Sequence, residues 1–196
     1  TSLKRIAQWV ALWLAIISVL VFMTILSTLI TFPVYAHMDD LPQIAVMSLG
    51  RLYQNYLQLM AYLNLPWVGT LHMNDFPTSV HGAIHFADVR HLFLFDIGVA
   101  VVTVPFAVRW LHQLRIARKR YLLVRPFMIG AVVPVVLTAI LAVNFDQFFI
   151  TFHEVLFRNS DWLFDPATDP IINVLPEGFF MLCFLTAFAL FEAVMI

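Results

Sequence analysis

Four long apolar runs constrain the fold of this chain more than any other feature of its sequence. They cover about residues 9–32, 92–112, 126–145 and 178–196. A helix of about 20 apolar residues is long enough to cross the hydrocarbon core of a bilayer. Inside lipid a backbone segment must satisfy its own hydrogen bonds, which an α-helix does. The runs therefore predict an all-α membrane protein with four transmembrane helices.

Composition supports the same class and excludes several others. The 196 residues are 62% hydrophobic and 12% charged, whereas about a quarter of the residues in a soluble domain are charged. The length suits one integral membrane domain over residues 1–196. A single cysteine, Cys183, excludes an intrachain disulfide framework. With a net charge of −1 and no glycine-rich phosphate loop, the chain is not expected to bind nucleic acid.

The first apolar run is interpreted as an uncleaved transmembrane helix rather than as a secretory signal. Lys4 and Arg5 precede it, as positive charges precede both kinds of segment. The tripeptide Val-Tyr-Ala at 34–36 resembles a cleavage site. A signal peptide, however, has an apolar core of only about 7–15 residues, which is shorter than this run. We therefore expect the helix to remain in the protein.

The distribution of positive charge predicts the orientation in the membrane. Eight of the eleven lysines and arginines flank one side, namely Lys4, Arg5, Arg109, Arg115, Arg118, Lys119, Arg120 and Arg125. Because cytoplasmic loops attract Lys and Arg, both termini and the loop 109–125 are expected to be cytoplasmic. Residues 33–91 and 146–177 are then extracytoplasmic. These two loops hold most of the acidic residues and six of the seven histidines.

Both extracytoplasmic loops are expected to contain short amphipathic helices. Between residues 43 and 63 four polar side chains recur at helical spacing, which predicts a helix on the membrane surface or capping the bundle. These side chains are Arg51, Gln54, Asn55 and Gln58. In the second loop, Asp169 followed by Pro170 resembles an N-cap and a first helical residue. A short helix is therefore predicted over 170–175.

His81, His85 and Asp88 form the first candidate constellation for chemistry. Spacings of four and three residues place them on one helical face. An imidazole serves as an acid, a base or a metal ligand, and a nearby carboxylate orients it. The alternative is that these groups, together with Arg90 and His91, solvate the end of a membrane helix. Both interpretations stay open at this point.

The second extracytoplasmic loop carries the other candidate, His153. It follows a strongly aromatic stretch, and Asp146 lies one to two turns earlier. His153 is a candidate acid or base, or alternatively a structural histidine held by a hydrogen bond. The aromatic residues of this loop, Trp162 among them, are typical of interfacial anchors. The same aromatic surface also suits acyl chains.

Two other function classes are compatible with these residues. A metal-dependent membrane hydrolase would use His81, His85 and His153, because a His-x-x-x-His spacing on a helix suits zinc. The glutamate that often follows the first histidine is replaced by Gly82, and the spacing alone is a weak signal, so no metal site is expected. A non-enzymatic small transporter is the second alternative, although no internal repeat supports it.

Two stretches of the chain resemble the motifs of a known family. They are HFADVRHL at 85–92 and FHEVLFRNSDWLFDPATDPIINVLPEGFF at 152–180. These stretches are similar to those of the bacterial lipoprotein intramolecular transacylase (Lit) family of integral membrane proteins. The matching positions are His85, Asp88, Val89, Arg90, Phe152, His153, Trp162, Asp165, Pro166, Asp169, Pro176 and Glu177. The four-span layout agrees as well, so the resemblance covers nearly the whole chain.

The resemblance implies an acyltransferase in the cell membrane of Gram-positive bacteria. Members of this family move the sn-2 acyl chain of an S-diacylglyceryl cysteine to the α-amino group of that cysteine, which gives a lyso-form lipoprotein. The expected partners are the N-terminus of a diacylated lipoprotein and membrane lipid, and no cofactor is expected. We also expect a monomer with its active site on the extracytoplasmic side.

Two histidines suffice for this chemistry as general acid and base. An α-amine has a pKa near 8, so a base must help to deprotonate it, and the leaving glyceryl oxygen needs a proton. His85, oriented by Asp88, is the expected base, and His153 the group that polarises the carbonyl or protonates the leaving oxygen. These roles are interchangeable, and an acyl-histidine intermediate is an alternative. The supporting residues are Asp88, Arg90, Asp146, Arg158 and Trp162, with Arg90 or Arg158 as candidate oxyanion donors.

Overall fold

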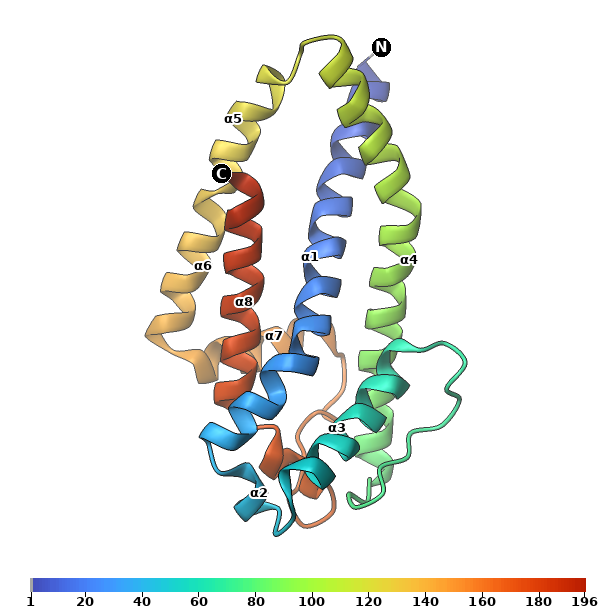
Figure 1. Cartoon of the computed structure of the whole chain (residues 1–196), viewed down its shortest axis with the longest axis vertical. Coiled ribbons are helices and arrows are strands. Elements are labelled where there is room, and N and C mark those ends of the chain that lie inside the picture. Colours follow the sequence, from blue (N-terminus) through green and yellow to red (C-terminus); the bar gives the residue numbers. More distant parts are fainter. Residues whose placement is uncertain (1) are drawn as a thin grey trace. The chain divides into compact units, whose positions relative to one another are not determined.

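A computed structural model describes residues 2–196 of the chain, and helices make up most of it (Figure 1). The helices of the apolar runs are α1 (Ser2–Met38), α4 (Val80–Ile116), α5 (Tyr121–Gly130), α6 (Val132–Val143) and α8 (Glu177–Met195). The other elements are α2 (Leu41–Ile44), α3 (Leu49–Asn64), α7 (Phe145–Leu156) and the 3-10 helix η1 (Pro170–Val174). Between residues 2 and 196 there is no strand. The predicted all-α class is therefore confirmed.

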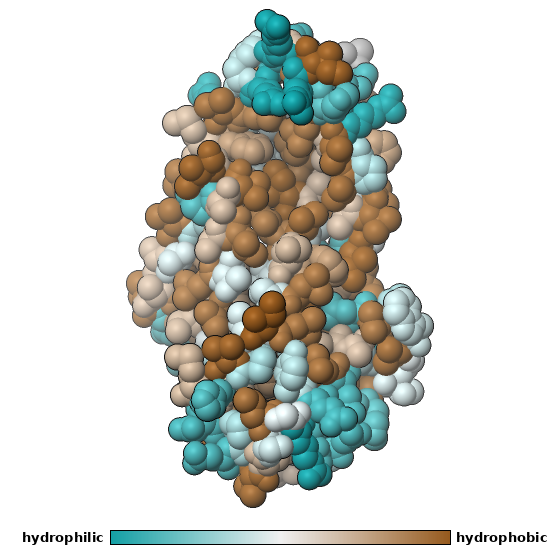
Figure 2. All heavy atoms as spheres, in the orientation of Figure 1, coloured by the Kyte–Doolittle hydropathy of each residue, from teal (hydrophilic) through white to brown (hydrophobic). Residues whose placement is uncertain are grey.

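Four helical segments are long and apolar enough to cross a membrane, as the sequence predicted. They are α1, α4, the α5–α6 segment Tyr121–Val143, and α8. Only 11–28% of each apolar window is buried inside the protein. Figure 2 shows hydrophobic side chains covering the face over α6 and α8 that is in view. Apolar surface left exposed to this extent is stable in lipid rather than in water.

The helices extend beyond the apolar runs from which they were predicted. Both α1 and α4 have 37 residues, which at 1.5 Å per residue is about 55 Å, far more than the roughly 30 Å hydrocarbon core. The extra turns of α4 lie at its start, because this helix begins at Val80. His81, His85 and Asp88 therefore belong to the first turns of a continuous helix.

The third membrane segment is interrupted between α5 and α6. Pro134 lacks a backbone N–H, so the carbonyl of Gly130, four residues earlier, cannot receive the usual helical hydrogen bond. The helix ends at Gly130 and resumes at Val132. A Cβ at Gly130 would lie 2.8 Å from both Trp13 and Met195. This break is thus also a point where α1 and α8 approach the α5–α6 segment closely.

The chain divides into two compact units. The first contains the chain up to Thr24, Phe95–Val143 and Phe184–Ile196. Its core joins α1 to α4 through Leu12, Ala15, Ala107, Trp110 and Leu114. The indole rings of Trp9 and Trp110 meet edge to face, with centroids 4.9 Å apart. This unit consists of membrane helices and carries none of the candidate site residues.

The second unit contains Ile25–Leu94 and Asn144–Cys183, and both candidate histidines belong to it. Its core forms where α3 packs against the C-terminal part of α1. Phe32 stacks on Tyr56 with ring centroids 3.8 Å apart, and the Tyr53 hydroxyl donates a hydrogen bond to the Leu29 carbonyl at 2.7 Å. Phe179 of α8 closes the cluster edge to face against Phe32 at 5.3 Å.

The amphipathic helix predicted between residues 43 and 63 forms as α3, and part of its polar side contacts the loop before α4. Asn55 is only 1% exposed. Its amide donates to the Asp75 carboxylate at 2.7 Å and accepts from the Asp75 backbone N–H at 2.9 Å. Arg51 pairs with the same carboxylate, and this guanidinium lowers the pKa of Asp75. The stripe therefore holds the loop before α4.

Candidate active site

The first turn of α4 is fixed by Ser79, which stands at its N-cap. The Ser79 hydroxyl accepts a hydrogen bond from the backbone N–H of Gly82 at 3.0 Å. This cap starts the helix so that His81, His85 and Asp88 share one face, as their spacing predicted. Their environments differ, because His81 is exposed while only 8% of His85 is.

His153 is held by α7, a helix capped by Asn144. The Asn144 side chain accepts a hydrogen bond from the Gln147 N–H at 3.1 Å. In the last turn, Nδ1 of His153 lies 2.8 Å from the carbonyl oxygen of Phe149. A carbonyl oxygen only accepts, so we assign the ring proton to Nδ1. The Nε2 atom of His153 then carries a free lone pair.

The two histidines meet within the second unit. Their ring centroids are 5.9 Å apart, and His153 is 9% exposed. Aromatic rings surround the pair, namely Phe86, Phe149, Phe152, Phe157, Trp162 and Phe164. Burial lowers the pKa of His153 below its ordinary value of 6.5, although the hydrogen bond to Phe149 acts in the opposite direction. A neutral, basic imidazole is thereby favoured.

Asp88 does not hold His85, contrary to the predicted orienting role. Its carboxylate accepts a hydrogen bond from the Asn159 amide at 2.9 Å. The buried Nδ1 atom of His85 makes no hydrogen bond with any residue in the range 2–196. Asp88 therefore acts on the loop that follows α7, and packing against the rings of Phe157 and Phe164 holds His85.

The loop after α7 contributes residues that sequence reasoning missed. Asp161 lies 2.5 Å from Nδ1 of His81, and the Asn159 carbonyl accepts from the indole N–H of Trp162 at 3.1 Å. Trp162 in turn packs on His153 with centroids 4.9 Å apart. The polar stretch RNSD was visible in the sequence. Nothing in it indicated contacts with residues 71 and 80 positions earlier.

Arg90 lies elsewhere than at the histidine pair. Its guanidinium donates to the carbonyls of Tyr62, Leu65 and Pro66 and lies 4.6 Å over the Tyr62 ring. Tyr62 lies in the last turn of α3, and Leu65 and Pro66 follow this helix, so Arg90 holds the C-terminal end of α3 and the turn after it. This geometry does not support the predicted oxyanion role.

Replacing Arg90 by glutamine is expected to lower stability and leave turnover per folded molecule nearly unchanged. The loss should be about 1–3 kcal/mol, because three carbonyls lose a charged donor. A lysine should restore little of it, since a point charge cannot reproduce the guanidinium fork. Thermal unfolding in detergent and kcat of the folded fraction measure the two effects. Arg158→Gln is the matched control, because Arg158 is exposed. A large fall in kcat at unchanged Tm would instead show that Arg90 takes part in the reaction.

Two other predicted supporting residues make no hydrogen bond or ion pair with either histidine among residues 2–196. Arg158 is exposed and makes no ion pair with any residue from 2 to 196. Asp146, at the start of α7, interacts with the carboxyl group of Glu177. Among residues 2–196, no three His, Cys, Asp or Glu side chains converge as they would around a metal ion. The imidazole of His81 pairs with Asp161 instead of joining the other two histidines.

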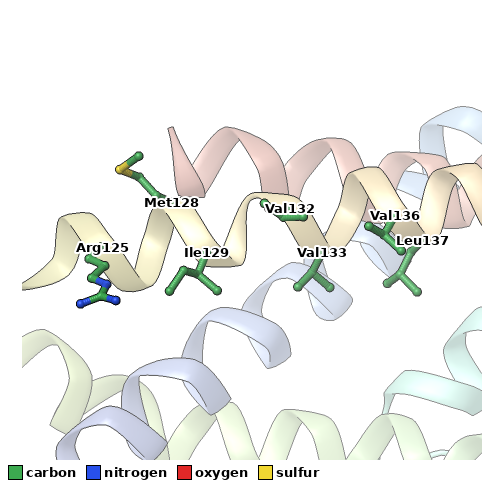
Figure 3. A pocket seen from close by; sticks show the side chains of 7 residues that line it. All are labelled: Arg125, Met128, Ile129, Val132, Val133, Val136 and Leu137. Atoms are coloured by element: carbon green, nitrogen blue, oxygen red, sulfur yellow. The ribbon is translucent and has the colours of Figure 1, made fainter.

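An apolar groove of about 640 Å³ lies along α5 and α6 in the first unit (Figure 3). It is lined by Arg125, Met128, Ile129, Val132, Val133, Val136 and Leu137. Apart from the Arg125 guanidinium, the lining side chains are all apolar, and none is a histidine, a carboxylate, a cysteine or a hydroxyl. The groove therefore offers no acid–base chemistry, and the histidine pair is the candidate active site.

The candidate Asp169 cap also differs from its prediction. The predicted short helix forms as η1, but Asp169 makes no side-chain hydrogen bond to it. The Asp169 carboxylate instead accepts from the backbone N–H of Ser79 at 2.8 Å. Asp165, four residues earlier, does cap its local turn and accepts from the Ala167 N–H at 2.9 Å.

Comparison with known proteins shows to which family the chain belongs. The family model for the lipoprotein intramolecular transacylase Lit matches residues 6–180. The chain belongs to the Lit family. It is accordingly a multi-pass membrane enzyme, an acyltransferase that acts on lipoproteins, which confirms the class predicted from the two motifs. No curated protein matches the chain.

Solved structures of a Lit from Bacillus cereus agree with the family assignment. The membrane-integral Lit from this organism is 26% identical to the chain, with a TM-score of 0.90 over 99% of the chain and 91% of the relative. Two further structures of that protein carry a histidine replaced by arginine or by alanine. They match with TM-scores of 0.80 and 0.79 at the same identity, over 99% of this chain and 88% and 89% of the relative. The relative comes from a Gram-positive bacterium, as the sequence motifs implied.

Proposed function

We propose that this Lit-family chain moves the sn-2 acyl chain of an S-diacylglyceryl cysteine to the α-amino group of the same cysteine. The observation that carries the proposal is the buried pair of His85 and His153, whose ring centroids are 5.9 Å apart. Two imidazoles at this separation can flank one reacting carbonyl. The α-amine attacks that carbonyl, and the product is an N-acyl cysteine with a free glyceryl hydroxyl.

The reaction needs one proton to move and no other reactant. The amine nitrogen loses a proton when its bond to the acyl carbon forms. The sn-2 oxygen gains a proton when its ester bond breaks. The lone pair on Nε2 of His153 suits removal of the first proton, because Nδ1 is engaged with Phe149. The same proton then passes from His153 to the leaving oxygen, directly or by exchange through His85, while the neutral His85 ring polarises the carbonyl. This reverses the roles expected from sequence.

The aromatic surroundings serve the same reaction. Phe157 contacts both imidazoles, with centroids 4.9 Å from His85 and 5.7 Å from His153. Rings around the pair exclude water, which would otherwise hydrolyse the ester. The attacking amine and the ester belong to one molecule, so holding them together gives a high effective concentration.

The site is proposed to face the outer leaflet of a bacterial cell membrane. Eight of the eleven lysines and arginines flank the opposite side of the membrane segments, and cytoplasmic loops attract such charges. Both termini are then cytoplasmic, and the chain is proposed to act as a monomer. The second unit, with its two extracytoplasmic segments, meets the lipid anchor of a lipoprotein on the outer side.

Mass spectrometry of a lipoprotein N-terminus tests the proposed reaction. The peptide from cells that express this chain is expected to carry an N-acyl group and one acyl chain on the glyceryl. The peptide from cells without the chain should carry two glyceryl acyl chains and a free amine. An unchanged diacylglyceryl peptide in both cultures would overturn the proposal.

The low pKa of His153 gives the reaction a predicted pH dependence. A base must be neutral to act, so kcat should fall on the acid side only as the pH drops through a value below 6.5. Trp162→Ala uncovers the imidazole, and the acid limb should then move up towards 6.5 because burial is the main cause of the shift. A pH profile of kcat for the two proteins measures this. If the acid limb does not move in Trp162→Ala, a group other than His153 causes the loss of kcat at low pH.

A further inference from the structure

The N-terminus of α4 contains an unusual cap that joins segments 90 residues apart. In a capping box, the N-cap Ser accepts from the N3 backbone N–H, and a Glu at N3 reaches back to the N-cap N–H. Here Ser79 accepts from the N–H of Gly82 at 3.0 Å, but glycine has no side chain to return the bond. The Ser79 N–H donates instead to Asp169 at 2.8 Å.

Asp169 occupies the space that an N3 side chain would fill. A Cβ built on Gly82 would lie 2.2 Å from Oδ1 of Asp169 and 2.9 Å from its Cγ. Asp169 is 2% exposed, and the second oxygen of its carboxylate accepts from the Thr168 hydroxyl at 2.9 Å. Burial by itself raises the pKa of this carboxyl, but the hydrogen bonds from Ser79 and Thr168 outweigh it and lower the pKa. Asp169 is therefore a charged acceptor with its bonds satisfied.

The segment that Asp169 holds in place also contains Phe164, an aromatic residue that packs on His85. The Asp169 N–H donates to the Asp165 carbonyl at 2.8 Å, which makes a tight turn directly after Phe164. The ring of Phe164 lies 5.4 Å from that of His85. Ile171, two residues beyond, is 1% exposed and anchors the other end in the core. On α4 itself, fewer than two turns of helix separate Ser79 from His85.

We propose that Asp169 is a positioning residue for the transacylation, which completes the capping box of α4 across the fold and sets Phe164 and its loop against His85. This inference rests on the proposed function. For its stability, α4 needs only an acceptor for the Ser79 N–H, and an acidic side chain at N3 would supply one. For activity, that acceptor must be Asp169, because its bond to Ser79 also anchors the loop that carries Phe164. Substitutions can separate the effect on stability from the effect on activity.

The test combines Asp169→Ala with Gly82→Glu. Removal of the carboxylate takes away both atoms of Asp169 that crowd Gly82, and the nearest remaining contact is Thr78 at 3.2 Å. The glutamate introduced by Gly82→Glu can then return the bond to Ser79 within α4 itself. We expect Asp169→Ala to lower both Tm and kcat. The double variant should regain Tm and keep a kcat about 10- to 100-fold below wild type, because the loop stays unanchored.

The activity assay is N-acylation of a synthetic diacylglyceryl lipopeptide, from which KM and kcat are determined separately. Tm is measured for each variant as well. Asp165→Ala is the matched control, since it removes a cap in the same loop without touching α4, and its kcat should stay within about threefold of wild type. If kcat recovers fully in the double variant, Asp169 only caps α4 and has no positioning role, which overturns the inference. A double variant that does not regain Tm overturns the capping role. A wild-type protein without product refutes the proposed function instead.

Discussion

Replacing His153 by asparagine is expected to lower kcat of transacylation by about 100- to 10,000-fold, the usual contribution of a positioned acid or base. The asparagine amide can still donate to the Phe149 carbonyl, which Nδ1 of His153 contacts at 2.8 Å. The last turn of α7 should therefore keep its geometry. What is lost is the Nε2 lone pair, so the variant isolates proton transfer from folding.

The measurement is the initial rate of lipopeptide N-acylation, with Tm recorded for each variant. His85→Asn should give a loss of similar size, because its ring lies opposite the same space. His91→Asn is the matched control, since His91 is an exposed histidine on the same helix as His85. A folded His153→Asn protein within about tenfold of the wild-type rate would remove His153 from the proposed chemistry.

Gly82→Ala is expected to destabilise the protein by about 1–3 kcal/mol, the usual cost of overpacking a filled site. The new methyl group would lie 2.2 Å from Oδ1 of Asp169, so the carboxylate must leave or the loop must shift. Either movement weakens the hydrogen bond to the Ser79 N–H. Because the loop that this bond anchors also walls the histidine pair, kcat should fall together with Tm.

A second glycine of the same helix provides the control for this prediction. A Cβ at Gly98 meets nothing within 4 Å, so Gly98→Ala should be neutral or stabilise α4 by up to about 1 kcal/mol. The effects of Gly82→Ala and Asp169→Ala should not add, because removal of the carboxylate frees the space that the methyl group needs. Additive losses of Tm in the double variant would show that the two residues do not share that space.

The membrane class and the chemistry-bearing segments were accessible from sequence because local patterns encode them. Apolar runs of bilayer length predict membrane helices without knowledge of their partners. The spacing of His81, His85 and Asp88 put them on one helical face, and the structure has them there. The family motifs pointed to His85 and His153 together, and their rings do lie near each other.

Side-chain partners were less accessible, because they depend on distant segments. Asp88 was expected beside His85, but Asn159 takes its carboxylate. Asp169 was expected to cap η1, but it accepts from Ser79. Arg90 was expected near an oxyanion, yet it binds the carbonyls after α3. In each case a polar group found a partner in another segment.

The sequence by itself determined that this chain is a four-span membrane enzyme, because hydrophobic length and motif spacing are properties of neighbouring residues. Only the tertiary structure decided how the histidine pair is held. A buried polar group takes whichever partner the fold brings within about 3 Å. That partner is often dozens of residues away. Gly82 is an example. The sequence does not explain why a glycine stands at N3 of α4, whereas the structure does, because Asp169 occupies the space that a side chain would need.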